Sequence, residues 1–579
     1  MSLLERVEAG EGHQEIEQGK RLIRAADDRG IRLAQRLAFR LRRLAWHGPG
    51  LRLRGRQPLR LVAVPKDPIA GDKLAGEALL HGMVAHGREK LKIEDLDFGD
   101  TSLSPAMVDY LHSFAWLRDL AAAATREKGA RLAEKITHRW LDLHAGRPDD
   151  RSWRPDLWGQ RILFWTAYAP YILSSRDPAY RSALLNALAR GARFLEGRAD
   201  QAAPGLARVT SWAGLVASAL LLQGGSPRLG HAETGFARAL AGALHDDGGL
   251  VSRSPAQQLA LVELLSQLRT VYYAGARQMP EVVQEALAGS VAALLAVVMG
   301  DEALSSWQGG NMLSRRRVIA AVEGSAVQAR PLRQARGWGY QRLAARGSVL
   351  IFDGAPPPPA RVFAGGSAST LAFEFSDGPD RLVVNCGGAG LWAGTLPPQL
   401  VHALRFTAAH STLTLGDRNS TAILEDGSLG RGVSQVLISR SETGGIARVE
   451  GNHDGYVKRF GLVHERELTL SPDGAELRGE DNLMPHGRKR RPGRPVPFAV
   501  RFHLGPGVEV TSTADGQGAL LRLRDTGAWQ FRCRGGALAI EDSLWVDGNG
   551  RPLSTFQLVI SGEAPPDGMN ISWLFRRAA

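Results

Sequence analysis

The sequence predicts a two-part α+β chain, in which an N-terminal (α/α) toroid of antiparallel helices is followed by a C-terminal antiparallel β-sandwich. Three observations predict this fold class. Apolar residues recur at helical spacing almost without interruption from about residue 100 to 323. Short loops rich in Gly, Asp and Ser separate these stretches, as expected where one helix ends and the next is capped. After about Gly337 the apolar period changes to two, which is typical of strands.

The helical half contains many segments of similar length joined by short loops such as GGSP and HDDGG. This rhythm favours an array of antiparallel helices or an α/α toroid, although the letters contain no strict repeat. The expected helices lie near residues 107–124, 157–173, 178–197, 205–223, 230–244, 255–274 and 280–299.

The second half reads as a series of short strands separated by Gly, Asp, Asn and Pro, the pattern of an antiparallel sandwich. The boundary between the halves is expected near residues 324–338, and the run Pro356–Pro359 is expected to mark a surface loop within the β half. We therefore divide the chain into a basic arm (1–70), a toroid (71–330) and a sandwich (331–579). The expected strands include YQRLAA, SVLIFD, STLAFEF, RLVVNC, STLTLG, VSQVLISR, LVHERELTL, AELRGE, FAVRFHL, VEVTST, ALLRLR, WQFRC and FQLVISG.

Length and composition exclude several classes of protein. The chain has 579 residues, enough for two to four domains with large cores. Its two cysteines, Cys386 and Cys533, are far apart, which excludes a disulfide framework and a thiolate zinc site. No stretch of 18 or more apolar residues is present, and the polar N-terminus lacks the features of a secretory signal. A cytoplasmic location, or a misassigned start, is therefore expected from the residues alone.

The formal net charge of +13 suggests a polyanionic partner such as nucleic acid, anionic lipid or acidic polysaccharide. Only nine of the 72 basic residues are lysine, however, and this skew resembles a genome-wide coding bias. The densest basic run, Arg488–Arg494, either steers an acidic chain toward the protein or forms a solvated hairpin loop. Its low aromatic content argues against single-stranded nucleic acid, which favours stacking platforms.

The N-terminal arm contains a basic amphipathic segment. Leu33, Leu37, Leu41 and Leu44 share one helical face, with arginines elsewhere. Such a segment either binds a membrane surface or partner protein, or packs its leucines on the main body.

A second amphipathic pattern combines aromatic residues with arginine. In SWRPDLWGQRILFWTAY, Trp158, Arg161, Trp165 and Tyr168 recur at helical spacing. A stripe of this kind is often part of a core. The same residue types also suit a sugar ring that carries a carboxylate, because aromatic rings stack on the sugar and arginine pairs with the acid.

The order of the two halves and several motifs resemble the heparinase II/III family of polysaccharide lyases, over nearly the whole chain. The resemblance implies β-elimination of an acidic polysaccharide, such as a glycosaminoglycan, in the cleft between toroid and sandwich, in the periplasm or cell envelope. No cofactor is expected. The motifs are YLHSFAWLRDL, SWRPDLWGQRI, DDGGLVSRSP, STLAFEFSDG, AAHSTLTLGD, NHDGYVKRFGLVHERELTL, RGEDNL and VRFHLGPGV.

β-Elimination needs a group that neutralises the uronate carboxylate, a base and an acid. In the family, Asn or His, Tyr and His supply these roles. Here Gln257 stands at the tyrosine position, and the RVTSWAGL stretch lacks the expected Asn-His pair. Ser367 and Asn385 replace a histidine and an aspartate that hold zinc in some members, beside His410. We therefore predict no zinc site.

Other polar groups could rebuild the reaction. The leading hypothesis assigns carboxylate contact to Arg253 or Arg405, and proton transfer to His410 and Tyr456 with His453. His453 could instead hydrogen-bond a tight turn. The remaining candidates for substrate contact are Gln257, Trp165 and Arg161.

Two alternatives remain open to the lyase hypothesis. One is a catalytically lapsed scaffold of the same fold that still binds acidic glycan. The other is a cytoplasmic or membrane-peripheral interaction protein that uses the basic arm.

Overall fold

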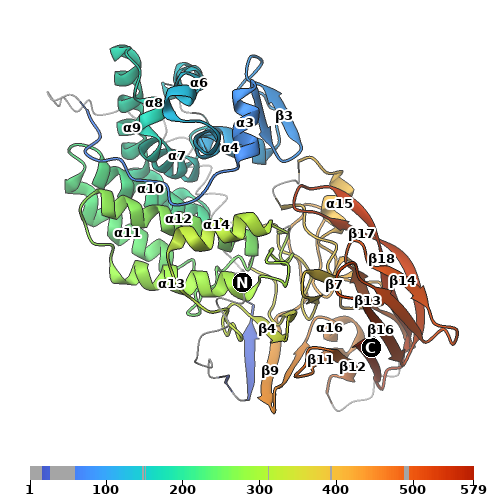
Figure 1. Cartoon of the computed structure of the whole chain (residues 1–579). Helices are drawn as coiled ribbons and strands as arrows, with labels where there is room; N and C mark the ends of the chain where they lie inside the picture. Colours follow the sequence, from blue (N-terminus) through green and yellow to red (C-terminus); the bar gives the residue numbers. More distant parts are fainter. Residues whose placement is uncertain are drawn as a thin grey trace.

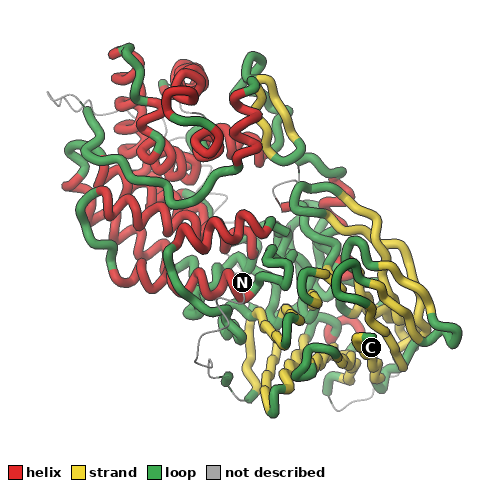
Figure 2. Tube along the Cα trace, in the orientation of Figure 1, coloured by secondary structure: helices red, strands yellow, loops and turns green. Residues whose placement is uncertain are grey.

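The helical half and the β half pack side by side in the chain (Figures 1 and 2). The computed structural model describes residues 16–17, 19–25, 59–146, 149, 151–310, 312–390, 394–487 and 494–578. The amphipathic leucine segment and residues 488–493 of the basic run lie outside these ranges. The predicted fold class, an (α/α) toroid followed by an antiparallel β-sandwich, is confirmed.

The helical half begins with α3 and a small hairpin, β2–β3, and ends with α14. Its elements are α3 (Lys73–Leu80), β2 (Met83–His86), β3 (Glu89–Lys92), α4 (Pro105–Ser113), α5 (Trp116–Ala123), α6 (Arg126–Trp140) with the π-helical turn η2 (Leu141–Ala145), α7 (Pro155–Ala167), α8 (Ala169–Ile172), α9 (Pro178–Arg198), η3 (Ala199–Gln201), α10 (Leu206–Leu221), η4 (Ser226–Arg228), α11 (Leu229–Ala241), α12 (Pro255–Ala274), α13 (Glu281–Ala296) and α14 (Arg315–Ser325).

Local sequence explains where several helices start and stop. The Ser104 hydroxyl caps α4 by accepting from the Met107 amide, and the Asp177 carboxylate caps α9. The predicted helix over 107–124 is divided at Phe114, whose left-handed conformation (φ 66°) ends α4. Helix α6 was not foreseen, because its fifteen residues are strongly polar on average and only a narrow stripe is buried.

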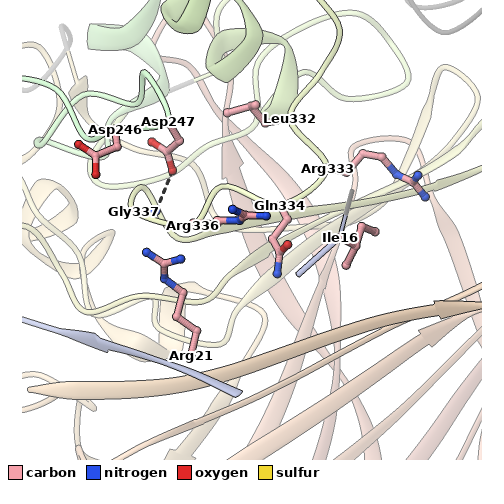
Figure 3. A pocket seen from close by; sticks show the side chains of 9 residues that line it. All are labelled: Ile16, Arg21, Asp246, Asp247, Leu332, Arg333, Gln334, Arg336 and Gly337. Carbon is pink, nitrogen blue, oxygen red and sulfur yellow. Dashed lines mark hydrogen bonds between the residues drawn. The ribbon is translucent and has the colours of Figure 1, made fainter. Parts of the chain in front are cut away.

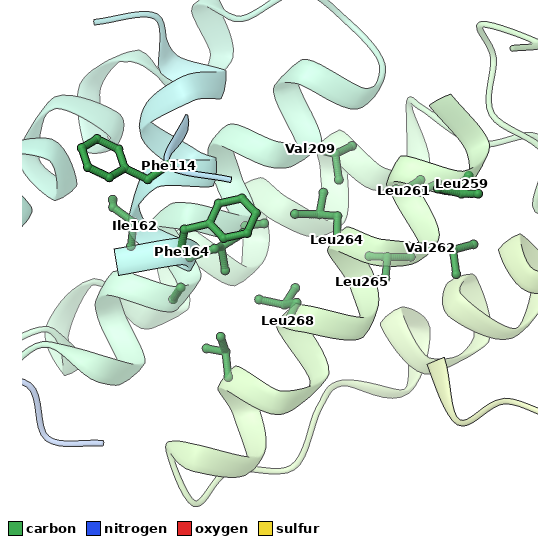
Figure 4. Close-up of a cluster of buried hydrophobic side chains, with 14 of the residues drawn as sticks. Phe114, Ile162, Phe164, Val209, Leu259, Leu261, Val262, Leu264, Leu265 and Leu268 are labelled. Atoms are coloured by element: carbon green, nitrogen blue, oxygen red, sulfur yellow. The ribbon is translucent and has the colours of Figure 1, made fainter. Parts of the chain in front are cut away.

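The toroid core is aromatic and leucine-rich. Trp116, Trp140, Trp158 and Trp165 are fully buried, and their rings meet mostly edge to face. Figure 4 shows the adjoining aliphatic part of this core, where leucines of α12 face Phe164 of α7.

The sandwich consists of two large sheets in which every described strand pair is antiparallel. One sheet has the order β1-β9-β10-β11-β12-β19-β16-β15-β14, and the other has the order β17-β18-β13-β7-β6-β5-β4 with β8 beside β13. The strands are β1 (Lys20–Arg24), β4 (Tyr340–Ala345), β5 (Ser348–Asp353), β6 (Phe373–Asp377), β7 (Asp380–Val384), β8 (Leu413–Leu415), β9 (Gln435–Thr443), β10 (Ile446–His453), β11 (Leu462–Leu470), β12 (Glu476–Pro485), β13 (Val496–Leu504), β14 (Glu509–Ser512), β15 (Gly518–Arg522), β16 (Ala528–Arg534), β17 (Ala537–Val546), β18 (Pro552–Ala564) and β19 (Met569–Arg577).

Alternating burial along the strands builds the sandwich core. In β11 every second residue from Leu462 to Leu470 is buried, and in β16 Trp529, Phe531 and Cys533 point inward. Short helices α15 (Pro398–Ala403) and α16 (Val457–Phe460) and the turn η6 (Thr407–Ala409) lie in loops of this half.

Hydrogen bonds join the two halves directly. The Asp247 carboxylate, from the loop after α11, accepts from the main-chain amides of Gly337 and Trp338 at 2.8 and 2.9 Å. Arg381 of β7 forms a two-pronged ion pair with Asp301 of the toroid, at 2.8 and 3.0 Å. Polar contacts of this kind fix the orientation of the sandwich relative to the toroid.

The chain also contains a strand that the sequence did not indicate. Residues Lys20–Arg24, expected as part of the arm, pair with β9 at the edge of the nine-stranded sheet (Figure 1). Among the described helices, none combines the length and apolar character needed to cross a bilayer.

Candidate functional site

The junction between toroid and sandwich is spanned by the proline loop, defined here as residues 354–366 after β5. Pro356 and its two neighbours Pro357 and Pro358 are buried, so the prediction of a surface loop is wrong for these three residues. The loop lies against the toroid: a Cβ added at Gly205, next to the start of α10, would meet Val362 Cγ1 at 3.5 Å. Proline composition indicates a loop but does not indicate which surface the loop covers.

Arg253 holds the beginning of the proline loop. Its Nη1 donates to the carbonyl oxygens of Ala355 and Pro356 at 3.3 and 3.0 Å, and its Nε donates to Trp338 O at 2.8 Å. Nη2 forms a 2.5 Å ion pair with Asp353 Oδ1. Burial disfavours the charge of this guanidinium, but the Asp353 carboxylate more than compensates and raises the pKa of Arg253.

The Asp353 carboxylate is itself fully buried and fully bonded. Oδ2 accepts from the Ser369 hydroxyl at 2.7 Å and from the Gln308 amide at 3.3 Å. The Tyr340 hydroxyl donates to the carbonyl of Arg253 at 2.7 Å, and the Arg253 guanidinium lies over the Tyr340 ring. This network was missed in the sequence, where only the position of Asp353 at the end of an apolar strand could have drawn attention to it.

Arg405 holds the far end of the proline loop. Its three nitrogens donate to three main-chain carbonyl oxygens, those of Gly366 (2.8 Å), Gly427 (2.5 Å) and Ala364 (2.9 Å). Burial without a nearby carboxylate lowers the pKa of Arg405. The two arginines that were expected to contact a substrate carboxylate therefore form hydrogen bonds to opposite ends of the proline loop.

His410 is buried just before β8. Its Nδ1 lies 2.7 Å from the carbonyl oxygen of Phe406, and because a carbonyl only accepts, Nδ1 carries the proton and Nε2 is unprotonated. Burial lowers the pKa of His410 to about 4. The imidazole is therefore neutral at pH 7.

Tyr456 and His453 lie next to each other in the sandwich core, with ring centroids 5.4 Å apart. The Tyr456 hydroxyl donates to the main-chain oxygen of Leu413 at 2.9 Å, and burial raises its pKa. It therefore serves as a hydrogen-bond donor inside the sandwich, 1% exposed.

His453 belongs to a chain of buried hydrogen bonds. His464 Nε2 donates to Asp481 at 2.7 Å, so His464 Nδ1 accepts from His453 Nε2 at 3.3 Å. His453 Nδ1 then accepts from the Gly455 amide at 3.1 Å. Burial lowers the pKa of both histidines, and their tautomers are fixed by the carboxylate at one end.

The remaining candidates lie in the toroid. Gln257 is half-buried in the first turn of α12. Trp165 and Arg161 are fully buried, and Arg161 is sandwiched between Trp140 and Trp158 while donating to main-chain carbonyls. The aromatic stripe of α7 thus forms part of the toroid core, out of reach of a polysaccharide.

The residues at the zinc positions form hydrogen bonds of their own. The Ser367 hydroxyl accepts from the Gly309 amide at 3.2 Å. Asn385 donates to Glu374 at 3.1 Å and accepts from the Ser411 amide at 3.0 Å. Within the described ranges no group of three or more His, Cys, Asp or Glu side chains is arranged to hold a metal ion.

Three cavities among the described residues are lined by none of these candidate side chains. A cavity of about 440 Å³ opens where the N-terminal strand, the toroid and the chain leading to β4 meet (Figure 3). In Figure 3 the side chains of Arg21, Arg336 and Gln334 extend into the same space. A second cavity, of about 460 Å³, lies on the toroid beside α6, and a third, of about 200 Å³, lies beside β7. The first is lined by Ile16, Arg21, Asp246, Asp247, Leu332, Arg333, Gln334, Arg336 and Gly337.

Comparison with known proteins identifies the second half of the chain. Residues 327–574 match the family model described as "Heparinase II/III-like, C-terminal". These residues form a heparinase II/III-like domain. The fold of the whole chain is similar to that of a solved heparinase III (TM-score 0.69, 13% identity, 91% of this chain and 88% of the other). It is also similar to heparan sulfate lyase HepC from Pedobacter heparinus (TM-score 0.56, 13% identity, 87% and 83%).

A relative whose name does not mention heparinase matches this chain over almost its full length. FtsZ-localized protein C of Caulobacter vibrioides is 29% identical over 553 residues, which span 92% of this chain and 93% of the relative. The resemblance to heparinase II/III is thus confirmed for the domain and for the fold. The Caulobacter vibrioides relative is described by its localisation with FtsZ.

Removing the Arg253 side chain, which joins the toroid to the heparinase II/III-like domain, should strongly destabilise the protein. Arg253→Met would leave the buried Asp353 carboxylate without its ion-pair partner, and the Trp338 and Pro356 carbonyls would lose the Arg253 donor. We expect the free energy of unfolding to fall by about 3 to 5 kcal/mol, measured by chemical denaturation.

The matched control is Arg522→Met on β15, whose ion pair with Glu509 is 72% exposed on the arginine side. We expect a change below about 1 kcal/mol there. Equal effects of the two substitutions would contradict the anchoring role of Arg253.

His410 should make the protein sensitive to acid. Because its pKa is about 4 in the folded state and about 6.5 when unfolded, the unfolded chain binds the extra proton between these values. Stability is therefore fully present above pH 6.5 and falls toward pH 4, by up to about 1.4 kcal/mol per pH unit for this group. We expect His410→Gln to flatten the pH dependence of unfolding in this window, with exposed His138→Gln as the control. An unchanged slope in His410→Gln would show that this histidine is not held neutral.

Proposed function

We propose that this protein is a non-catalytic interaction scaffold that keeps the heparinase II/III-like architecture and localises with FtsZ. The observation that carries the proposal is the engagement of Arg253 and Arg405 with the proline loop. Arg253 donates through all three of its nitrogens to carbonyl oxygens and to Asp353, and Arg405 donates through all three of its nitrogens to carbonyl oxygens. These contacts support a structural role for both side chains in place of contact with a uronate carboxylate.

The groups needed for proton transfer support the same interpretation. β-Elimination requires a base beside the sugar carbon and an acid at the leaving oxygen. At the tyrosine position of the family stands Gln257, an amide that does not titrate near neutral pH. Tyr456 is engaged with a main-chain carbonyl in the sandwich core, and His453 is engaged with His464. The three cavities described above are lined by none of the sequence-predicted acid and base candidates.

The relative from Caulobacter vibrioides supports the cellular part of the proposal. That protein is described as FtsZ-localized, and the match covers more than nine-tenths of both chains. Likeness over the full length includes the toroid, the sandwich and the connection between them. We therefore transfer localisation with FtsZ to this chain as a proposal.

Lyase activity on a uronate-containing polysaccharide is the second candidate. It is favoured by the similarity to the heparinase III fold and by the unprotonated Nε2 of His410, which could accept a proton. In that case the substrate would be an acidic polysaccharide of the cell envelope. A scaffold that binds such a glycan without cleaving it lies between the two candidates.

Incubation of the purified protein with heparin, heparan sulfate, chondroitin sulfate, alginate, hyaluronan and bacterial envelope glycans separates these possibilities. We expect no increase in the ultraviolet absorbance of an unsaturated uronate, because the acid and the carboxylate contact are missing. An active heparinase III serves as the positive control. An increase that His410→Gln abolishes would overturn the non-catalytic proposal, and calorimetry on the same glycans would detect binding without turnover.

Localisation is tested in the source cells with a fluorescent fusion and labelled FtsZ. Coincidence of the two signals through the cell cycle is the expected result. A uniform distribution of the fusion in dividing cells would overturn this part of the proposal, whatever the outcome with glycans.

We further propose that the basic amphipathic segment contacts an anionic membrane surface. Its four leucines and interspersed arginines have the composition of an interfacial helix. The chain on either side is attached to the protein: Ala25 donates to Ser434 O, and Arg60 O accepts from Gln223. A test must therefore spare both attachments.

Replacing residues 26–58 by a Gly/Ser segment of equal length should abolish co-sedimentation with vesicles that contain anionic lipid. A second variant, with Leu33, Leu37, Leu41 and Leu44 changed to Ser, keeps every arginine and separates apolar insertion from charge attraction. Binding that survives both changes would remove the membrane proposal.

A further inference from the structure

The N-terminal strand β1 is attached to the sandwich through the outer edge of β9. Lys20 lies opposite Ser439 and Arg24 lies opposite Gln435, with the five residues in continuous antiparallel register. The ladder is extended by a 2.8 Å hydrogen bond from the Ala25 amide to Ser434 O. Among the strands that the structure describes, β1 pairs with β9 alone, and this main-chain ladder supplies most of its attachment.

Side chains of β1 contribute little burial. Ile23 packs at the margin of the sandwich core, whereas Leu22 is 43% exposed. Lys20 pairs with Glu450 at 3.2 Å, but its side chain is 57% exposed. Exposed ion pairs of this kind contribute about 0 to 1 kcal/mol each. The strand is thus bound specifically by register and weakly by side chains.

The residues before β1 complete the cavity of Figure 3. Ile16 and Arg21 form one of its walls, while the toroid contributes Asp246 and Asp247. The Glu17 amide donates to Gln334 Oε1 at 3.0 Å.

The Glu17 carboxylate also bridges two cations. It lies 3.2 Å from Arg336 Nε and 3.2 Å from Arg21 Nη1. Residues 16–25 therefore dock as one unit on a surface made by the sandwich, the toroid and their connection.

This docked unit is separated along the chain from the next described residue, Leu59, by 33 residues. A chain of that length can span at most about 110 Å. A compact domain of 579 residues has a radius of gyration of about 25 Å. The chain is thus long enough for residues 16–25 to reach the β9 edge of a neighbouring molecule.

We propose that two copies of this protein exchange residues 16–25, each placing its β1 on the β9 edge of the other. Because the edges are identical, the exchanged pair keeps every hydrogen bond of the ladder, the Glu17 bridge and the closed wall of the cavity. The exchanged dimer has a two-fold axis, and each cavity then contains Ile16 and Arg21 from the other copy.

The outer edge of β9 needs a strand beside it, for a reason that is seen when β1 is removed. Without β1, residues 435–439 of β9 would lose their main-chain partners on the outer side, and the exposed groups would be a template for uncontrolled pairing. Covering the edge in the same molecule or in a second copy satisfies these groups equally. The choice between the two then depends on protein concentration, because pairing within one chain competes with pairing between chains.

Disulfide trapping tests the exchange in the full-length chain. Leu22 lies directly opposite Leu437 in the ladder, and opposed antiparallel residues lie within the Cα separation that a disulfide accepts. Both natural cysteines are buried. Leu22→Cys and Leu437→Cys are introduced into separate, differently tagged chains, which are mixed over a range of concentrations and oxidised.

The control pairs Leu22→Cys with Leu520→Cys on β15, near the opposite end of the same sheet. We expect a covalent heterodimer from the first mixture, rising with concentration and at least tenfold above the control, and a dimer mass in light scattering. The double variant Leu22→Cys/Leu437→Cys in one chain verifies that the ladder forms. If that variant closes its disulfide only within single chains while the mixed chains give no more than the control, the exchange is excluded.

Discussion

The buried ion pair between Arg253 and Asp353 is the constraint on which the arrangement of the two halves depends. Arg253 comes from the turn before α12, and Asp353 ends β5, so the pair joins the toroid to the sandwich at the start of the proline loop. Two buried charges are tolerated only when each is paired and hydrogen-bonded. Trp338, Ser369 and Gln308 supply those bonds and are thereby fixed as well. The backbone of Arg253 adopts φ 56°, a conformation that a non-glycine residue holds only where its surroundings compensate.

The spacing of apolar residues in the sequence predicts much of the fold. It does not predict which partners the charged residues contact. The strands Tyr340–Ala345, Ser348–Asp353 and Leu462–Leu470 have the bounds expected from the sequence. Every second residue of Leu462–Leu470 is buried, whereas all six residues of Ser348–Asp353 are buried. The sequence does not indicate helix α6 or strand β1, because most of their residues are polar and few are buried. The sequence indicates Arg253 and Arg405 as potential anion contacts, but Arg253 binds Asp353 and main-chain carbonyls, and Arg405 binds main-chain carbonyls, all distant in sequence. No pattern of side chains predicts such partners.

The proposed scaffold role would separate similarity of fold from similarity of chemistry in this chain. The heparinase II/III-like domain and the toroid are retained over nearly the full length, yet the polar groups at the junction bind one another and the proline loop. A scaffold of this kind needs only core packing and stable contacts between its two halves. Catalysis also requires side chains that are free to contact the reacting atoms of a substrate. These contacts support the proposal that the junction has a structural role.

The hydrogen-bond chain from Gly455 through His453 and His464 to Asp481 runs in one direction, because the carboxylate at its end accepts only. Each ring must therefore donate with one nitrogen and accept with the other. Because the direction of the hydrogen-bond chain is fixed, only a side chain that both donates and accepts can replace His464. Glutamine can donate and accept at once and could be tolerated, whereas lysine, which only donates, would place two donors face to face. Drift at these inner positions of the sandwich should consequently be slower than at the exposed strands around them, even in relatives that share no reaction.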